Sequence, residues 1–109
     1  MIKPEKKFME AAIEEAHNAK NEGDYSIGAV IVKDGNIIIR ATNRAKIDND
    51  STQHAEMVAI REASKILGTR FLEECILYTT HEPCPHVCLR CYLGPNERNS
   101  FWVYSKRHD

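Results

Sequence analysis

An unbroken run of apolar and β-branched side chains at residues 75–80 (CILYTT) sets the architecture that this chain can adopt. A run without alternation between apolar and polar positions is typical of a strand that is buried on both faces. Such a strand needs a layer of helices on each side, because otherwise one apolar face would meet water. We therefore predict a sheet that lies between two helical layers.

The rest of the chain supplies elements for both layers. Residues 4–20 carry apolar side chains at three- and four-residue spacing before Gly23, which predicts a first helix. Residues 26–32 and 37–41 are β-rich runs on either side of an Asp-Gly pair, which predicts an antiparallel hairpin.

A second helix is expected to begin close to His54 and to end at Gly68, after a polar stretch at 48–52 that offers N-cap residues. A third helix is expected after Cys84. This order of elements predicts an α/β fold with three layers, α/β/α, around a mixed sheet.

The size and composition of the chain limit what it can do. With 109 residues it is expected to form a single domain, 1–109. The formal net charge of −1 gives no overall basic field, so we expect no nucleic-acid partner. The N-terminal residues contain no signal-peptide core and the apolar runs are short, so a cytoplasmic protein without a membrane segment is expected. Its four cysteines then favour metal binding or catalysis over disulfides.

Three residues carry the chemistry suggested by this composition. His54 and Glu56 lie at the predicted helix start, and Cys84 follows the buried strand. Imidazole and thiolate are zinc ligands, and a catalytic zinc keeps three protein ligands and one position for water. Zinc lowers the pKa of that water from about 15.7 towards about 7. Glu56 lies about 200° around an ideal helix from His54, so we predict that it moves protons and does not bind the ion.

The motifs resemble those of the cytidine deaminase-like superfamily of zinc-dependent deaminases. The triplet HAE at 54–56 and the pair PC at 83–84 match the signature His-x-Glu followed by Pro-Cys-x-x-Cys up to its first cysteine. The similarity runs from about Phe8 to Pro85. It is closest to guanine and cytosine deaminases, and transfer-RNA adenosine deaminases share the core motifs.

This resemblance implies a function and roles for individual residues. It implies zinc-dependent hydrolytic deamination of a nucleobase or nucleoside of the guanine, cytosine or cytidine type. It makes His54 and Cys84 zinc ligands, Glu56 the proton shuttle and Asn43 a substrate-contacting amide. Two alternatives are a truncated, catalytically inactive zinc-binding domain that self-associates and a transfer-RNA adenosine deaminase. We also expect a homodimer, because a shortened three-layer domain leaves apolar surface for a second copy to cover.

The chain departs from the family after Pro85. The family has its second cysteine three positions after the first, where this chain has Val87. Cys88, four positions after Cys84, shares a helix face with it, so we predict Cys88 as the third ligand, with His86 and Cys91 as alternatives.

A change of reading frame would explain this departure. Codons for residues 86–94, read one nucleotide later, can encode a Met-Cys pair followed by a helix of the family type. We therefore hypothesise a frameshift near codon 86. On this hypothesis residues 86–109 form an atypical tail that does not complete the fold, and the chain is a C-terminally truncated member of the cytidine deaminase-like fold.

Overall fold

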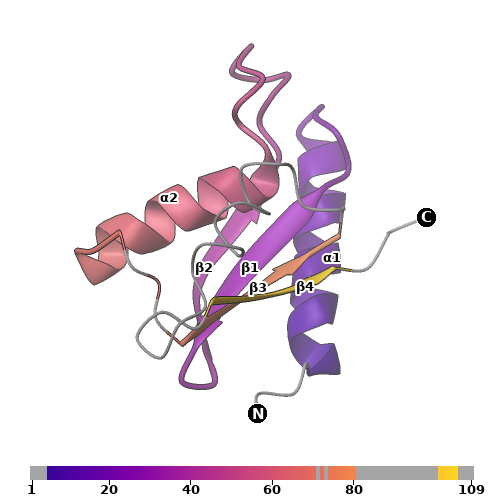
Figure 1. Cartoon of the computed structure of the whole chain (residues 1–109). Helices are drawn as coiled ribbons and strands as arrows, with labels where there is room; N and C mark the ends of the chain where they lie inside the picture. Colours follow the sequence, from indigo (N-terminus) through magenta and orange to yellow (C-terminus); the bar gives the residue numbers. More distant parts are fainter. Residues whose placement is uncertain (1–4, 71, 73, 81–100, 106–109) are drawn as a thin grey trace.

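The computed structural model describes residues 5–70, 72 and 74–80, together with the backbone of residues 101–105 (Figure 1). The elements in this part of the chain are α1 (Lys6–Asn21), β1 (Gly28–Lys33), β2 (Asn36–Thr42), α2 (Ala55–Leu67), β3 (Cys75–Thr79) and β4 (Phe101–Ser105).

The strands form one mixed sheet in the order β2-β1-β3-β4. Strand β1 pairs antiparallel with β2 and with β3, whereas β3 pairs parallel with β4. The hairpin between β1 and β2 turns at Asp34 and Gly35, whose φ angles of 53° and 76° are those of a tight hairpin turn. The predicted mixed sheet and hairpin are confirmed.

Each of the two helices packs against a different face of the sheet, as Figure 1 shows. Alternate residues of a strand point to opposite faces, so Ala29 and Ile31 of β1 join the cluster of α2, whereas Val30 and Val32 join the cluster of α1. Every residue of β3 is buried. The predicted three layers, with a strand buried on both faces, are therefore confirmed.

The first helix lies directly on the start of β1. A Cβ atom at Gly28 would lie 2.4 Å from the backbone oxygen of Ala12 and 2.4 Å from the backbone nitrogen of Ala16. Contacts this short do not occur between real side chains and backbone. Only glycine therefore allows α1 to approach the sheet so closely.

The observed elements differ from expectation in three places. Strand β1 begins at Gly28, two residues after the predicted start. The N-cap of α2 is His54, and no residue of the polar stretch at 48–52 takes that position. Residues 101–105, which the frameshift hypothesis assigns to the atypical tail, form β4 and extend the sheet beside β3. The third helix expected after Cys84 lies outside the described residues.

In the described ranges, neither helix has the length and apolar character needed to cross a membrane.

Candidate active site

His54 and Glu56 lie side by side where α2 begins. His54 has extended backbone angles, φ −72° and ψ 148°, and its side chain makes no capping hydrogen bond. Because His54 precedes the helix, the separation of an ideal helix does not apply, and its Nδ1 lies 3.5 Å from Oε1 of Glu56. This contact is an ion pair only when the imidazole is protonated. The two side chains can therefore act on the same group.

The carboxylate of Glu56 is buried, with 1% of the residue exposed. Thr79, the last residue of β3, donates a hydrogen bond from Oγ1 to Oε2 of Glu56 at 3.3 Å. Glu56 also lies in the first turn of α2, where the helix dipole favours a negative charge. The start of α2 and the end of β3 thus meet at this carboxylate, and Cys84 comes five residues after Thr79 in the sequence.

Asn43 lies one residue beyond β2 and is also buried, with 1% exposure. Its Nδ2 donates to Oδ1 of Asp24 at 2.8 Å, and its Oδ1 accepts a hydrogen bond from the backbone N–H of Ala55 at 3.3 Å. Asn43 therefore satisfies the first N–H of α2, a task that the side chain of His54 does not perform. Its role in contacting substrate stays a prediction.

Asp24, which no sequence motif indicates, links Asn43 to the loop before α2. Its carboxylate accepts hydrogen bonds from the backbone N–H groups of Tyr25, Lys46 and Ile47 at 2.7, 3.0 and 2.9 Å, besides the one from Asn43. Burial raises the pKa of Asp24, but the four hydrogen bonds together lower it by more than burial raises it. The net pKa of Asp24 therefore lies below the ordinary value of 3.8. No motif marks Asp24, because an aspartate after a helix-ending glycine is typical of a turn.

The loop between β2 and α2 is ordered by its own polar contacts. The guanidinium of Arg44 makes two hydrogen bonds of 3.0 Å to the carboxylate of Asp48, and the backbone N–H of Arg44 donates to the carbonyl of Gln53 at 2.9 Å. The side-chain amide of Gln53 donates to the same carboxylate at 3.0 Å. These contacts close the loop immediately before His54.

The described side chains fit one part of a zinc site. The imidazole of His54 is 43% exposed and is not used as a helix cap, so it is available as a nitrogen ligand beside the buried Glu56. Within the described ranges there is no group of three or more His, Cys, Asp and Glu side chains placed to hold a metal ion. The other predicted ligands lie outside those ranges: Cys84, Cys88 and the alternatives His86 and Cys91.

Cys75 has a structural place instead. It is fully buried in the core cluster beneath α2 and begins β3, whereas Thr79 and the Glu56 contact lie at the other end of that strand. A buried free cysteine of this kind packs as a small apolar side chain.

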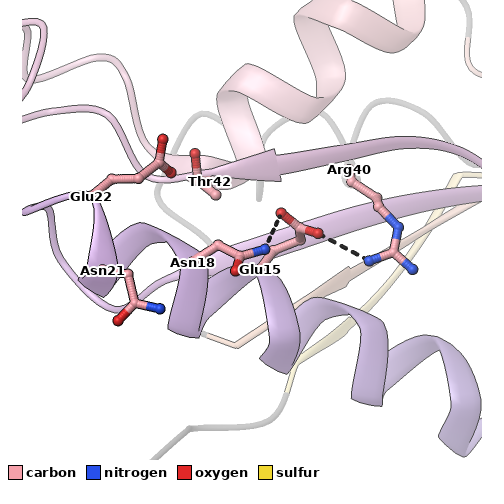
Figure 2. Close-up of a pocket in the computed structure, with 6 residues that line it drawn as sticks. All are labelled: Glu15, Asn18, Asn21, Glu22, Arg40 and Thr42. Carbon is pink, nitrogen blue, oxygen red and sulfur yellow. Dashed lines mark hydrogen bonds and ion pairs between the residues drawn. The ribbon is translucent and has the colours of Figure 1, made fainter.

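An open pocket of about 490 Å³ lies elsewhere, between α1 and β2 (Figure 2). Arg40 Nη1 lies 2.9 Å from Oε2 of Glu15, and Asn18 donates to the other oxygen of Glu15 at 3.3 Å. The carboxylate of Glu15 in this pocket is therefore already paired. None of the residues that line this pocket belongs to the start of α2, so the pocket is separate from the candidate site at His54 and Glu56.

Comparison with known proteins shows the family of this chain. The family model for the cytidine and deoxycytidylate deaminase zinc-binding region matches residues 2–93. A guanine deaminase from Bacillus subtilis is 49% identical over 97 residues, which are 88% of this chain and 62% of that protein. A tRNA-specific adenosine deaminase from Aquifex aeolicus is 42% identical over 101 residues, which are 93% of this chain and 67% of that protein.

Comparison with solved structures also indicates the deaminase family. The X-ray structure of guanine deaminase from Bacillus subtilis superposes with a TM-score of 0.79 at 38% identity, over 95% of this chain and 66% of that one. The chain thus spans about two thirds of the length of these proteins. The family match, its zinc-binding region and the shared fold lead to one conclusion: the chain belongs to the cytidine and deoxycytidylate deaminase zinc-binding family.

Proposed function

We propose that this protein hydrolytically deaminates a nucleobase or nucleoside of the guanine, cytosine or cytidine type. The observation that carries the proposal is the buried carboxylate of Glu56 beside the imidazole of His54. A buried carboxylate next to a zinc ligand is the arrangement that hydrolytic deamination needs, because the reaction moves protons close to an activated water. The guanine deaminase relative supports a substrate of this class.

Each residue of the site has a separate task in this reaction. His54, with Cys84 and Cys88, would hold zinc, which when bound supplies a Lewis acid and an activated water near neutral pH. Deamination replaces an exocyclic amine by a carbonyl and releases ammonia, so protons must pass from water to the ring nitrogen and to the departing amine. Glu56 is placed to carry them: Thr79 donates to Oε2, and Oε1 lies towards His54. Asn43 would contact the substrate.

Adenosine in transfer RNA is a second candidate substrate. The relative from Aquifex aeolicus is a tRNA-specific adenosine deaminase, and a Bacillus subtilis protein of the same description is 48% identical over 100 residues. These relatives weaken the expectation, drawn from net charge, that nucleic acid is not a partner. The two candidates differ in size of substrate and are therefore easy to distinguish by assay.

The test is a turnover measurement on protein of known zinc content. Ammonia release is measured with guanine, cytosine and cytidine, and conversion of adenosine to inosine is measured in transfer RNA. We expect release with at least one nucleobase or nucleoside. Conversion in transfer RNA alone would favour the second candidate. Bound zinc with no turnover would favour the alternative of an inactive, self-associating zinc-binding domain.

The variant Glu56→Gln tests the proton shuttle. Removing a general acid–base group costs about 10²- to 10⁴-fold in rate, so we expect a loss of this size in kcat with zinc still bound. The matched control is Glu62→Gln on the same helix, where the carboxylate is 43% exposed and pairs with Lys65 at 3.2 Å. This control should keep its activity. A Glu56→Gln protein as active as the unchanged enzyme would contradict the assignment.

A further inference from the structure

The buried carboxylate of Asp24 is connected to the active site through one side chain. Asp24 accepts a hydrogen bond from Asn43, and Asn43 accepts one from the first N–H of α2. We propose that Asp24 is a positioning residue that fixes the orientation of the Asn43 amide and, through it, the helix start that carries His54 and Glu56. The proposal rests on the proposed function only because that function makes His54 a zinc ligand and Glu56 the proton shuttle.

The first step concerns the chemistry of the two side chains. An ionised carboxylate can only accept hydrogen bonds, whereas a side-chain amide donates from one end and accepts at the other. Asp24 therefore requires the NH₂ group of Asn43 to face it, at the observed 2.8 Å. The carbonyl end of Asn43 must then face the opposite way, towards the N–H of Ala55. Asp24 thus selects the amide orientation that can cap α2.

The second step concerns the helix start. The first N–H groups of a helix have no partner within the helix and need an external acceptor. His54 provides none from its side chain, and Asn43 accepts from Ala55 at 3.3 Å. Ala55 lies between His54 and Glu56 in the chain. The capping bond therefore holds the backbone segment that sets the 3.5 Å spacing between Nδ1 and Oε1.

The third step is the rigidity of Asp24 itself. The residue is 6% exposed, and its backbone N–H donates to the carbonyl of Ala19 at the end of α1 at 3.0 Å. Its Oδ2 accepts the N–H groups of Lys46 and Ile47 in the loop before α2. Asp24 is thus held from two sides, by α1 and by this loop. It can therefore act as a fixed reference for the amide of Asn43.

The variant Asp24→Asn tests the proposal through metal binding. If the oxygen of the new side chain keeps its bonds to Lys46 and Ile47, the NH₂ group takes the place of Oδ1. It then faces the N–H of Tyr25 and the amide of Asn43. The amide of Asn43 must turn to accept from it and so loses the bond to Ala55. Residues that orient metal ligands typically contribute about 10- to 100-fold to metal affinity. We expect zinc affinity, measured by competition with a chelator, to fall about tenfold or more. Amide hydrogen exchange at Ala55 in metal-free protein should become faster.

The matched control is Asp48→Asn, in the same loop. The Asp48 carboxylate binds Arg44 and Gln53 but has no contact with Asn43. Zinc affinity and exchange at Ala55 should stay within twofold of the unchanged protein. An equal loss in both variants would show that general loosening of the loop is the cause, which would overturn the proposal.

The double variant Asp24→Asn with Asn43→Asp restores the match of donor and acceptor between the two side chains and keeps one carboxylate in the pair. Here the new amide at 24 donates to the new carboxylate at 43, which still accepts from Ala55. We expect zinc affinity and protection of Ala55 to recover most of the loss. A double variant as weak as Asp24→Asn would overturn the proposal, and so would an Asp24→Asn protein that binds zinc normally.

Asn43→Ala keeps the test decisive if Asp24→Asn does not fold. This variant leaves the bonds of Asp24 to Lys46 and Ile47 in place and removes the cap together with the hydrogen bond that Asn43 donates to Asp24. The same loss of zinc affinity is expected, and unchanged affinity would overturn the proposal. Because these measurements do not use turnover, absence of deaminase activity would count against the proposed function and leave this inference standing.

Discussion

At the scale of single residues, the candidate active site depends on one backbone conformation. His54 is extended and Glu56 is helical, so the two side chains approach although they are only two residues apart. Residues on an ideal helix at this spacing point in nearly opposite directions. The boundary between loop and helix therefore produces the pair, and Asn43 and Asp24 hold that boundary in place.

The pH dependence of stability should report on Asp24. Burial raises the pKa of Asp24. The hydrogen bonds that its carboxylate accepts outweigh burial and bring the pKa below the ordinary value of 3.8; they come from Ile47, Asn43, Tyr25 and Lys46. A carboxyl whose pKa is lower in the folded state stabilises the fold fully above about pH 5, and this contribution is lost as the pH falls through the folded-state pKa.

We expect the free energy of unfolding, measured in denaturant from pH 7 to pH 3, to fall less steeply with acid for Asp24→Asn than for the unchanged protein. The exposed Asp50, whose pKa is lowered by its hydrogen bond with Thr52, supplies the control. Asp50→Asn should keep most of the acid sensitivity. Parallel acid profiles for the Asp24→Asn and unchanged proteins would contradict this prediction.

At the scale of elements, the two helices use the sheet differently. Helix α1 approaches the backbone of β1 directly at Gly28, whereas α2 packs on the sheet through small side chains such as Ala59 and Ala63. The aromatic rings of Phe8 and Tyr78, 5.5 Å apart, fill the space between α1 and β3. Helix α1 can therefore approach the backbone of β1 closely because residue 28 is a glycine and has no side chain.

The substitution Gly28→Ala should be destabilising through steric overlap. The added Cβ would meet backbone atoms of α1 at 2.4 Å, which cannot be relieved by turning a side chain. Overpacking of a core costs about 1–3 kcal/mol, and backbone overlap lies at the upper end or beyond. Thermal or denaturant unfolding measures the change.

Gly68→Ala is the comparison for this substitution. Gly68 ends α2 at a φ of 69°, and its Cβ position has no neighbour within 4 Å, so the cost there is only that of a left-handed conformation, about 1–2 kcal/mol. We expect Gly28→Ala to lose more stability than Gly68→Ala. The reverse order would show that α1 moves away from the sheet easily.

At the scale of the whole molecule, apolar groups remain on the surface. Tyr25, Ile47 and Ile66 are 53%, 43% and 57% exposed, and β2 lies at one end of the described sheet with three consecutive isoleucines. An edge strand of this composition can pair with another chain, and exposed apolar surface is commonly covered by a partner. These features support the homodimer proposed from the sequence.

Light scattering at increasing protein concentration tests the dimer. We expect a mass of twice that of the 12.5 kDa chain at micromolar concentrations. The measurement should be repeated after removal of zinc with a chelator, to separate association from metal binding. A stable monomer across this range would contradict the prediction.

The sequence by itself determined the types of the elements and the identity of the chemical groups. The helical spacing before Gly23, the Asp-Gly turn and the buried run at 75–80 are local patterns, and local patterns follow directly from the periodicity of helices and strands. The His-x-Glu triplet was readable for the same reason, because its two members are neighbours in the chain.

The tertiary structure decided which groups act together. Asp24, Asn43 and Ala55 are separated by 19 and 12 residues, and they meet only because α1, the end of β2 and the start of α2 converge. The parallel pairing of β4 with β3 likewise joins segments far apart in the chain. Hydrogen bonds between distant segments leave no periodic mark in a sequence, so only the folded molecule shows that a turn aspartate is hydrogen-bonded to the residue that caps α2.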